Sequence, residues 1–122
     1  MATVNPVVTT ITTLPRGYLV VWELDGLTTT DTYTGQELLG NADRSVQLVG
    51  AAGAGGFNSC TVQIQGSNDN SNWVVLTDGL GNNLQFTAAG IKQIAEATRY
   101  IRAVVTSGTA GTDLQAKVYT RA

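Results

Sequence analysis

The sequence predicts an all-β fold, an antiparallel β-sandwich of jelly-roll-like type with little or no helix. Apolar and polar residues alternate with a period of two in Cys60–Ile64 and in Leu114–Val118, the pattern of strands that bury one face. Clusters of Gly, Asn, Asp and Ser separate such segments at short intervals, as in sandwiches and barrels. A chain of 122 residues, 43% of them hydrophobic, suits a single domain with a real core.

The first 15 residues carry both prolines of the chain, Pro6 and Pro15. Proline has no N–H to give to a sheet, so it is confined to edge strands and irregular segments. Residues 1–15 are therefore predicted to be either an edge strand of the domain or an extended arm that lies on a neighbouring subunit. Residues 16–122 are predicted to form one β-sandwich domain.

The next part of the chain predicts two strands separated by a long connection. Tyr18–Leu24 is a strand whose faces are both largely apolar, so it is expected to be covered on both sides. Residues 25–45 are polar and turn-rich, and they form a long connection or a short strand between two loops. A strand at 46–49 follows. The small-residue segment 51–56 predicts a turn, because no Lys-Ser/Thr ending of a phosphate-binding loop follows its glycines.

A predicted strand then runs into a tight polar turn at 66–72, and Trp73 opens the next strand, 73–77. Cys60 shares one strand face with Val62 and Ile64, which predicts a buried, structural thiol. Trp73 is predicted to pack under its own hairpin, and stacking on a sugar ring is the alternative.

The remaining segments predict three strands and one ambiguous stretch. The strands span residues 84–87, 99–106 and 113–121. Residues 88–97 fit either a short, weak helix or a strand across 91–94, because Gly90 and the scattered apolar residues favour neither structure strongly.

The sequence holds few groups that could perform chemistry. It has no His and one Cys, which excludes a Cys–His nucleophile and removes the usual ligands of zinc. A calcium site in the turn 68–72 is an alternative, but calcium prefers several carboxylates and this turn has one. No catalytic, cofactor or metal site is predicted, and the chain is not expected to be an enzyme. The aspartates are interpreted as caps of turns: Asp25, Asp31, Asp43, Asp69, Asp78 and Asp113.

Charge and hydropathy limit the partners that the chain can have. The net charge is −2 and no run of Lys or Arg occurs, so no nucleic-acid partner is predicted. No apolar run approaches the ~20 residues of a membrane span, so no membrane partner is predicted. The N-terminus lacks the basic and apolar regions of a signal peptide, and the protein is expected to be made in the cytoplasm and to stay there.

Several short segments follow one another in a characteristic order and spacing: Arg44-Ser45-Val46-Gln47, Val62-Gln63-Ile64-Gln65-Gly66-Ser67-Asn68-Asp69, Trp73, Leu76-Thr77-Asp78, Phe86-Thr87-Ala88-Ala89-Gly90-Ile91, Arg99-Tyr100-Ile101-Arg102 and Gly111-Thr112-Asp113-Leu114. Together they resemble the small head decoration (cement) proteins of tailed bacteriophages, over roughly residues 30–120. The turn before Trp73 alone is also similar to a hairpin of discoidin-type carbohydrate-binding modules, which makes a sugar-binding module, virion-borne or not, the alternative function.

The resemblance to decoration proteins implies a β-sandwich without cofactors that binds the outside of the assembled capsid. The implied partners are the major capsid protein and the chain itself, commonly as a homotrimer at local threefold axes. Such a protein stabilises the head by bridging neighbouring capsomers, and its location is the capsid exterior of the virion.

A low content of charged residues agrees with a surface that partners cover. Charged residues make up 13% of the chain, about half of the usual share. Two segments outside the clearest core strands, 3–13 and 25–45, carry backbone groups that need partners, and they are the predicted contact regions. The candidate contact residues are Thr3, Val4, Asn5, Pro6, Val7, Thr28, Thr29, Asp31 and Tyr33.

Overall fold

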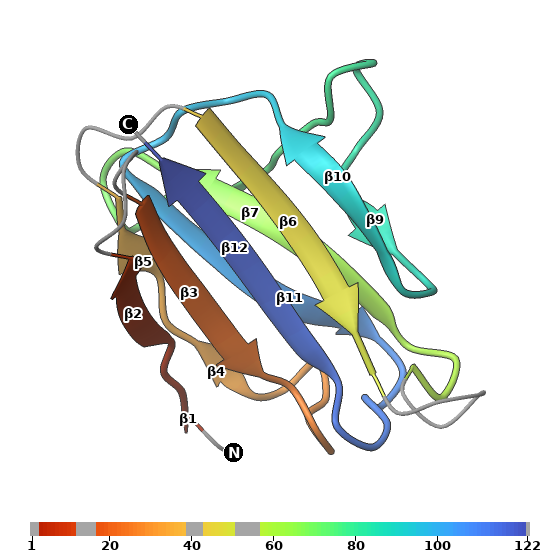
Figure 1. The fold of residues 1–122 in the computed structure, drawn as a ribbon. Helices are drawn as coiled ribbons and strands as arrows, with labels where there is room; N and C mark the ends of the chain where they lie inside the picture. Colours follow the sequence, from red (N-terminus) through yellow and green to blue (C-terminus); the bar gives the residue numbers. More distant parts are fainter. Residues whose placement is uncertain (1–2, 12–16, 39–42, 51–56, 122) are drawn as a thin grey trace.

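Two antiparallel sheets face each other in the computed structural model, which describes residues 3–11, 17–38, 43–50 and 57–121 (Figure 1). The first sheet contains, in spatial order, β10 (Gly90–Ile94), β6 (Asp43–Val49), β12 (Gln115–Arg121), β3 (Gly17–Glu23) and β2 (Val7–Ile11). The second contains β5 (Gln36–Glu37), β11 (Tyr100–Ser107), β7 (Thr61–Ser67) and β8 (Val74–Val75), with β9 (Gln85–Phe86) also paired to β7. A separate parallel pair joins β1 (Thr3–Val4) to β4 (Thr32–Tyr33).

This arrangement confirms the predicted all-β sandwich. No helix occurs in the described ranges. The ambiguous stretch 88–97 contains strand β10, which pairs antiparallel with β6 and has Ile94 opposite Arg44. Of the two interpretations of that stretch, the strand is therefore the correct one.

Strand β12 holds the first sheet together from its centre. It pairs antiparallel with β3 on one side and with β6 on the other, so that Val118 lies opposite both Val20 and Val46. All three of these valines are fully buried. Because successive side chains of a strand point to opposite faces, this register aligns one apolar row of each strand toward the second sheet.

The core consists of the inward rows of both sheets. Trp22 of β3 is its largest fully buried side chain, and Tyr18, on the same predicted face, is 38% exposed at the sheet margin. Strands β3, β6 and β12 contribute most of the inward row of the first sheet, and β7 and β11 contribute most of that of the second. The row of the first sheet contains Val20, Trp22, Val46, Leu48, Ala116 and Val118. It faces a row that contains Val62, Ile64, Ile101, Ala103 and Val105.

Cys60 lies in this core, as predicted. Its side chain is 1% exposed, and burial raises the pKa of its thiol above the ordinary value. A raised pKa keeps the thiol protonated at neutral pH, and only the thiolate is an effective nucleophile. The native protein therefore offers no reactive cysteine from this position.

Several predicted boundaries are corrected by the structure. The connection 25–45 contains two strands of two residues, β4 and β5, and β6 begins at Asp43 rather than at residue 46. The early start was missed because Arg44, a charged residue, occupies an inward position and is only 4% exposed. Strand β8 covers 74–75 of the predicted 73–77. The predicted turn at 51–56, residues 39–42 of the turn-rich connection and residues 12–15 lie outside the described residues.

The polar turn after β7 is closed by one carboxylate, as predicted for a capping Asp. Asp69 Oδ1 accepts hydrogen bonds from the backbone N–H groups of Asn72 (2.8 Å) and Ser71 (2.9 Å) and from Ser67 Oγ (2.8 Å). Asp69 Oδ2 accepts one from Asn72 Nδ2 at 2.7 Å. These bonds favour the ionised form and hold the pKa of Asp69 well below its usual value of 3.8.

Substituting Asp69 with Asn should make the protein less sensitive to acid. The depressed pKa of Asp69 means that its contribution to stability is complete above the ordinary pKa and is lost as the pH falls toward the folded-state pKa. Asp69→Asn should therefore lower the urea midpoint at neutral pH and reduce the further fall of that midpoint between about pH 5 and about pH 2. Asp113→Asn is the control, since Asp113 is an exposed turn residue with a φ of 57°, which Asn tolerates. Equal pH profiles for the parent and Asp69→Asn would contradict the assignment.

Candidate partner-contact surface

The two predicted contact segments lie side by side although they are separate in sequence. Strand β1 runs parallel to β4, with Thr3 opposite Thr32 and Val4 opposite Tyr33. The Val4 carbonyl accepts hydrogen bonds from the backbone N–H (3.0 Å) and the hydroxyl (2.7 Å) of Thr34. Figure 1 places both strands at the same end of the sandwich as the N-terminus.

Two of the candidate residues serve as anchors of this region. Val4 and Tyr33 are each 6% exposed, so their side chains belong to the core. The Tyr33 hydroxyl donates a 2.7 Å hydrogen bond to the Thr28 carbonyl, and burial raises the pKa of Tyr33 to about 12. Tyr33 therefore stays neutral and keeps this bond at any physiological pH.

The turn that leads into β4 is fixed by its own side chains. The Thr28 N–H donates to Asp31 Oδ2 at 2.8 Å, and the hydroxyl groups of Thr28 and Thr30 lie 3.0 Å apart. Thr28 also forms an isolated antiparallel bridge with Thr109, which joins the turn to the end of the sandwich. The turn is thus held in one conformation from both sides.

Thr34 connects this region to the core, and sequence reasoning did not single it out. Its carbonyl accepts a 3.2 Å hydrogen bond from Trp22 Nε1, and its hydroxyl lies 3.1 Å from Asn5 Oδ1. A threonine in a turn-rich segment gives no periodic signal, so only the three-dimensional arrangement identifies it.

The residues left at the surface form what we call the contact surface. Thr3, Asn5, Val7 and Thr29 are exposed, and Pro6, Thr28 and Asp31 are half-buried. Asp31 is the one charged member of this set. The contact surface is therefore almost neutral and is carried on a backbone that is hydrogen-bonded to the core.

Trp73, the alternative site considered from the sequence, is packed against its own chain. The guanidinium carbon of Arg102 lies 4.2 Å from the centroid of the Trp73 ring, and a Cβ at Gly35 would collide with that ring. Arg102 Nε donates to Gln65 Oε1 at 2.8 Å, so the cation is held in place over the ring. Stacking of a cation on Trp occupies a ring face that a sugar would need.

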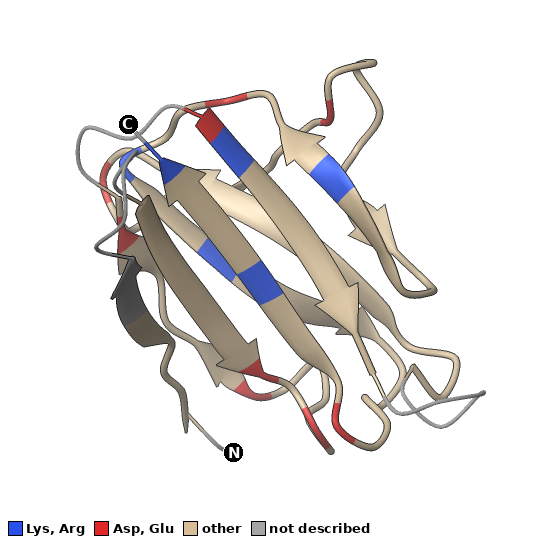
Figure 2. Ribbon diagram, viewed as in Figure 1, with Lys and Arg blue, Asp and Glu red and all other residues tan. Residues whose placement is uncertain are grey.

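The described residues contain no group of three or more His, Cys, Asp or Glu that could hold a metal ion. Within the same ranges no helix is long and apolar enough to cross a membrane. Figure 2 shows Lys and Arg along the strands and at the upper end of the view, whereas the lower end of the sandwich, near the N-terminus, carries only Asp and Glu among its described charged residues.

The comparisons with known proteins give no further guide to function. No family model matches the chain, and no curated protein and no solved structure is significantly similar to it.

Proposed function

We propose that this protein is a structural component of a tailed-bacteriophage virion, a decoration or cement protein that binds the outer surface of the assembled head. Its partners are the major capsid protein and further copies of itself, with a homotrimer as the expected assembly. It is made in the host cytoplasm and acts on the capsid exterior, where it stabilises the head by bridging capsomers.

The observation that carries this proposal is the joining of the N-terminal segment to the connection before β4 in one contact surface. Thr3, Asn5 and Thr29 offer hydroxyl and amide groups, which bind through neutral hydrogen bonds. Such contacts are individually weak. Repetition over a symmetric lattice raises their combined affinity without any single strong site.

The rigidity of the contact surface supports a mechanical function. Thr34 donates hydrogen bonds to the Val4 carbonyl in the contact segment and accepts one from Trp22 Nε1 in the core. Two consecutive contacts therefore connect the contact surface to the largest buried side chain. Force on the surface would be transmitted to the sheets rather than absorbed by a loose loop. A preorganised surface also loses little conformational entropy on binding.

Binding of the purified protein to heads that lack it tests the proposal. Thr29→Glu, which adds a charge to the contact surface, should weaken binding at least about tenfold, equivalent to about 1.4 kcal/mol. Thr87→Glu is the matched control, because Thr87 is exposed in the turn after β9, outside the contact surface. The parent protein should also bind almost equally at low and high salt, since the surface carries few charges to screen.

Three results would contradict the proposal. Failure of the parent protein to bind heads would overturn the function itself. Equal binding by Thr29→Glu and Thr87→Glu would overturn the contact surface while leaving the function intact. Saturable binding to glycans, with none to heads, would favour the carbohydrate-binding alternative.

A further inference from the structure

The ends of the two sheets differ in how they are protected against pairing with another strand. An edge strand presents unpaired N–H and C=O groups, and natural proteins protect such edges by short length or by charge. At the ends of the second sheet, β5, β8 and β9 each contain two residues. A strand this short offers few backbone groups of its own for a stable addition, and β5 pairs with only Tyr100 and Ile101 of β11.

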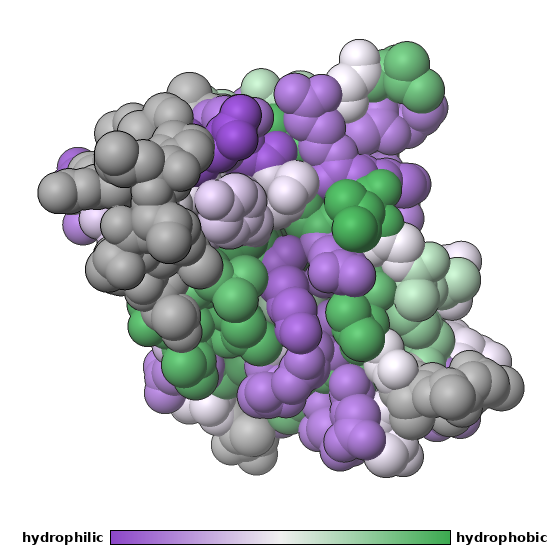
Figure 3. Space-filling model, in the orientation of Figure 1, coloured by the Kyte–Doolittle hydropathy of each residue, from purple (hydrophilic) through white to green (hydrophobic). Residues whose placement is uncertain are grey.

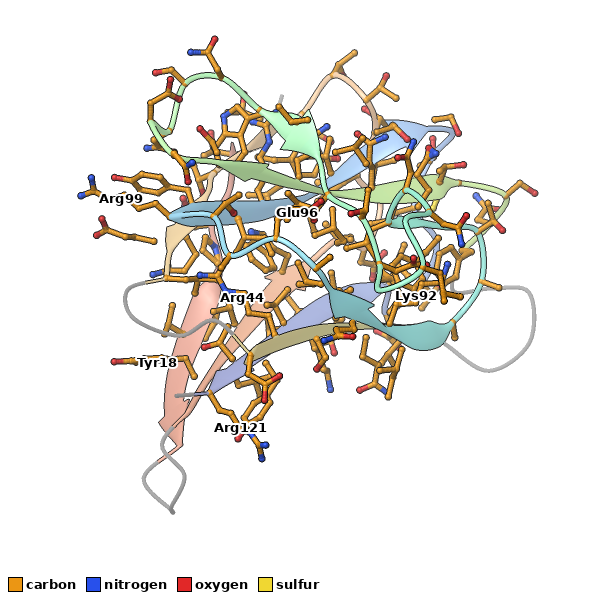
Figure 4. All side chains as sticks on the ribbon, turned by 90° about the horizontal axis from the view of Figure 1, so that it is seen from above. Tyr18, Arg44, Lys92, Glu96, Arg99 and Arg121 are labelled. Carbon is orange, nitrogen blue, oxygen red and sulfur yellow. The ribbon has the colours of Figure 1, made fainter. Side chains whose placement is uncertain are left out.

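The β10 edge of the first sheet is protected by an inward-facing charge. Lys92 lies opposite Val46, a fully buried residue, and therefore belongs to the inward row of the sheet. The Lys92 Nζ is 5.1 Å from the centroid of the ring of Phe86, a residue of β9 in the second sheet. Lys92 is labelled in Figure 4. A strand added next to β10 would bury this ammonium group, at a high desolvation cost.

The β2 edge of the same sheet has no such protection. Strand β2 spans Val7–Ile11, its partner is β3, and no described strand lies on its other side. Its sequence, Val-Val-Thr-Thr-Ile, consists of β-branched residues with high strand propensity, and residues 1–15 include no charged side chain. Val7 is 60% exposed and Val8 is 43% exposed.

A hollow lies next to this edge, between the two sheets. It has a volume of about 180 Å³ and is lined by Val8, Tyr18, Gln36, Glu37 and Leu38. Val8 pairs with Val20 and so faces the interior side of the first sheet. A strand added to β2 would direct every second side chain to that same side, where the hollow can receive it.

We propose that β2 is a self-association edge, which pairs antiparallel with β2 of a second copy of this chain. An antiparallel contact between identical segments places the residue on the twofold axis opposite its own counterpart and the remaining residues opposite other residues of the same segment, so charges of one sign on β2 would repel one another across the contact. The segment 1–15 has none, and it is electrostatically compatible with itself. The result is a continuous sheet that extends across two copies.

The contact closes at two copies because the opposite edge is blocked. A head-to-tail contact of β2 with β10 would propagate into a ring or filament, but Lys92 prevents it. An antiparallel pair of identical strands has a twofold axis and leaves no further β2 edge open. This twofold contact does not rest on the proposed capsid function, although it shares Val7 with the contact surface, and it uses a different symmetry axis from a threefold assembly.

A matched pair of lysine substitutions tests which edge associates. Val7 and Ile91 lie on the outward rows of β2 and β10 and are similarly exposed, at 60% and 65%. Sedimentation equilibrium should show a twofold association that Val7→Lys weakens at least about tenfold and that Ile91→Lys leaves unchanged. Circular dichroism verifies that both variants are folded. Equal effects of the two substitutions, or a parent protein without an even-numbered assembly at millimolar concentration, would overturn the proposal.

Cysteine cross-linking provides a second test that does not depend on stability. Because Cys60 is buried, a cysteine introduced into β2 would be the one reactive thiol. In an antiparallel pair about a twofold axis, one position lies nearest to its own copy. Single cysteines placed in turn at 7–11 should therefore form disulfide-linked dimers most rapidly at one position, with slower reaction on either side. Uniformly slow reaction, no faster than that of Ile91→Cys, would exclude antiparallel pairing of β2 with itself.

Discussion

Trp22→Ala is expected to destabilise the protein by about 3–5 kcal/mol, the largest effect of any single substitution considered for this chain. Trp22 is fully buried near the end of β3, and its removal would leave a cavity between the two sheets. It would also remove the hydrogen bond from Nε1 to the Thr34 carbonyl, which joins the contact surface to the core. Since small domains are stable by only about 5–15 kcal/mol, a large part of the population could unfold.

Urea denaturation followed by far-UV circular dichroism measures this loss. Trp73→Ala is the matched control because it makes the same change at a half-buried ring that contacts Arg102. Trp73→Ala should lower the free energy of unfolding by only about 1–2 kcal/mol, because it removes a cation–π contact and a side chain that is only partly buried. If the two alanine variants unfold at the same urea concentration, the structure assigns the core to the wrong tryptophan.

Arg44→Ala is expected to cost about 2–4 kcal/mol, because it leaves one buried and one partly buried carbonyl group without their donor. The Arg44 guanidinium donates hydrogen bonds to the Thr98 carbonyl (2.7 Å) and to the Leu38 carbonyl (3.3 Å). Burial lowers the pKa of Arg44, yet a guanidinium remains charged at neutral pH. Arg44, labelled in Figure 4, thus joins the segment before β6 to the segment before β11 through these two bonds.

The neighbouring Arg121 gives the control for this prediction. Arg121 Nε lies 3.1 Å from Asp43 Oδ2, but both side chains are about half exposed. An exposed ion pair contributes little, so Arg121→Ala should cost less than about 1 kcal/mol. The stability of Arg44→Lys should fall between those of the two alanine variants, because a lysine ammonium group cannot reproduce the planar arrangement of the two guanidinium donors. A loss in Arg44→Ala no larger than that in Arg121→Ala would refute the structural role of Arg44.

The strands that could be predicted best from sequence are those with one buried face. In β7 the alternation of Val62 and Ile64 with Gln63 and Gln65 reports directly which face is buried. In β3 the apolar character of both faces predicted cover on both sides, but full burial of side chains is confined to the inner row, and the outward Leu19 and Val21 are half-buried. Figure 3 shows the outer face of this sheet, where hydrophobic areas lie on both sides of a polar band. The alternation of apolar and polar residues predicts a strand well where each residue's polarity matches the exposure of its side chain.

The features that could not be predicted depend on long-range contacts. Nothing in the sequence near Val4 indicates that its carbonyl accepts from Thr34, because a parallel pair of two-residue strands leaves no periodic pattern. The inward position of Arg44 contradicts the alternation rule, and its hydrogen bonds to the carbonyls of Thr98 and Leu38 help to explain it. The two contact segments could be identified separately as exposed and polar, but their meeting is a property of the tertiary fold.

The central position of β12 has a consequence for synthesis of the chain on the ribosome. Strands β3 and β6 emerge early, yet each obtains β12 as a neighbour only after the whole of the second sheet has been translated. At a typical elongation rate this delay is on the order of seconds, far longer than hairpin formation. During that interval Val20 and Val46 lack the Val118 that will lie between them, and the nascent chain exposes two unfinished strands. Slow codons or a premature stop before residue 115 would prolong that exposure and favour aggregation or capture by a chaperone.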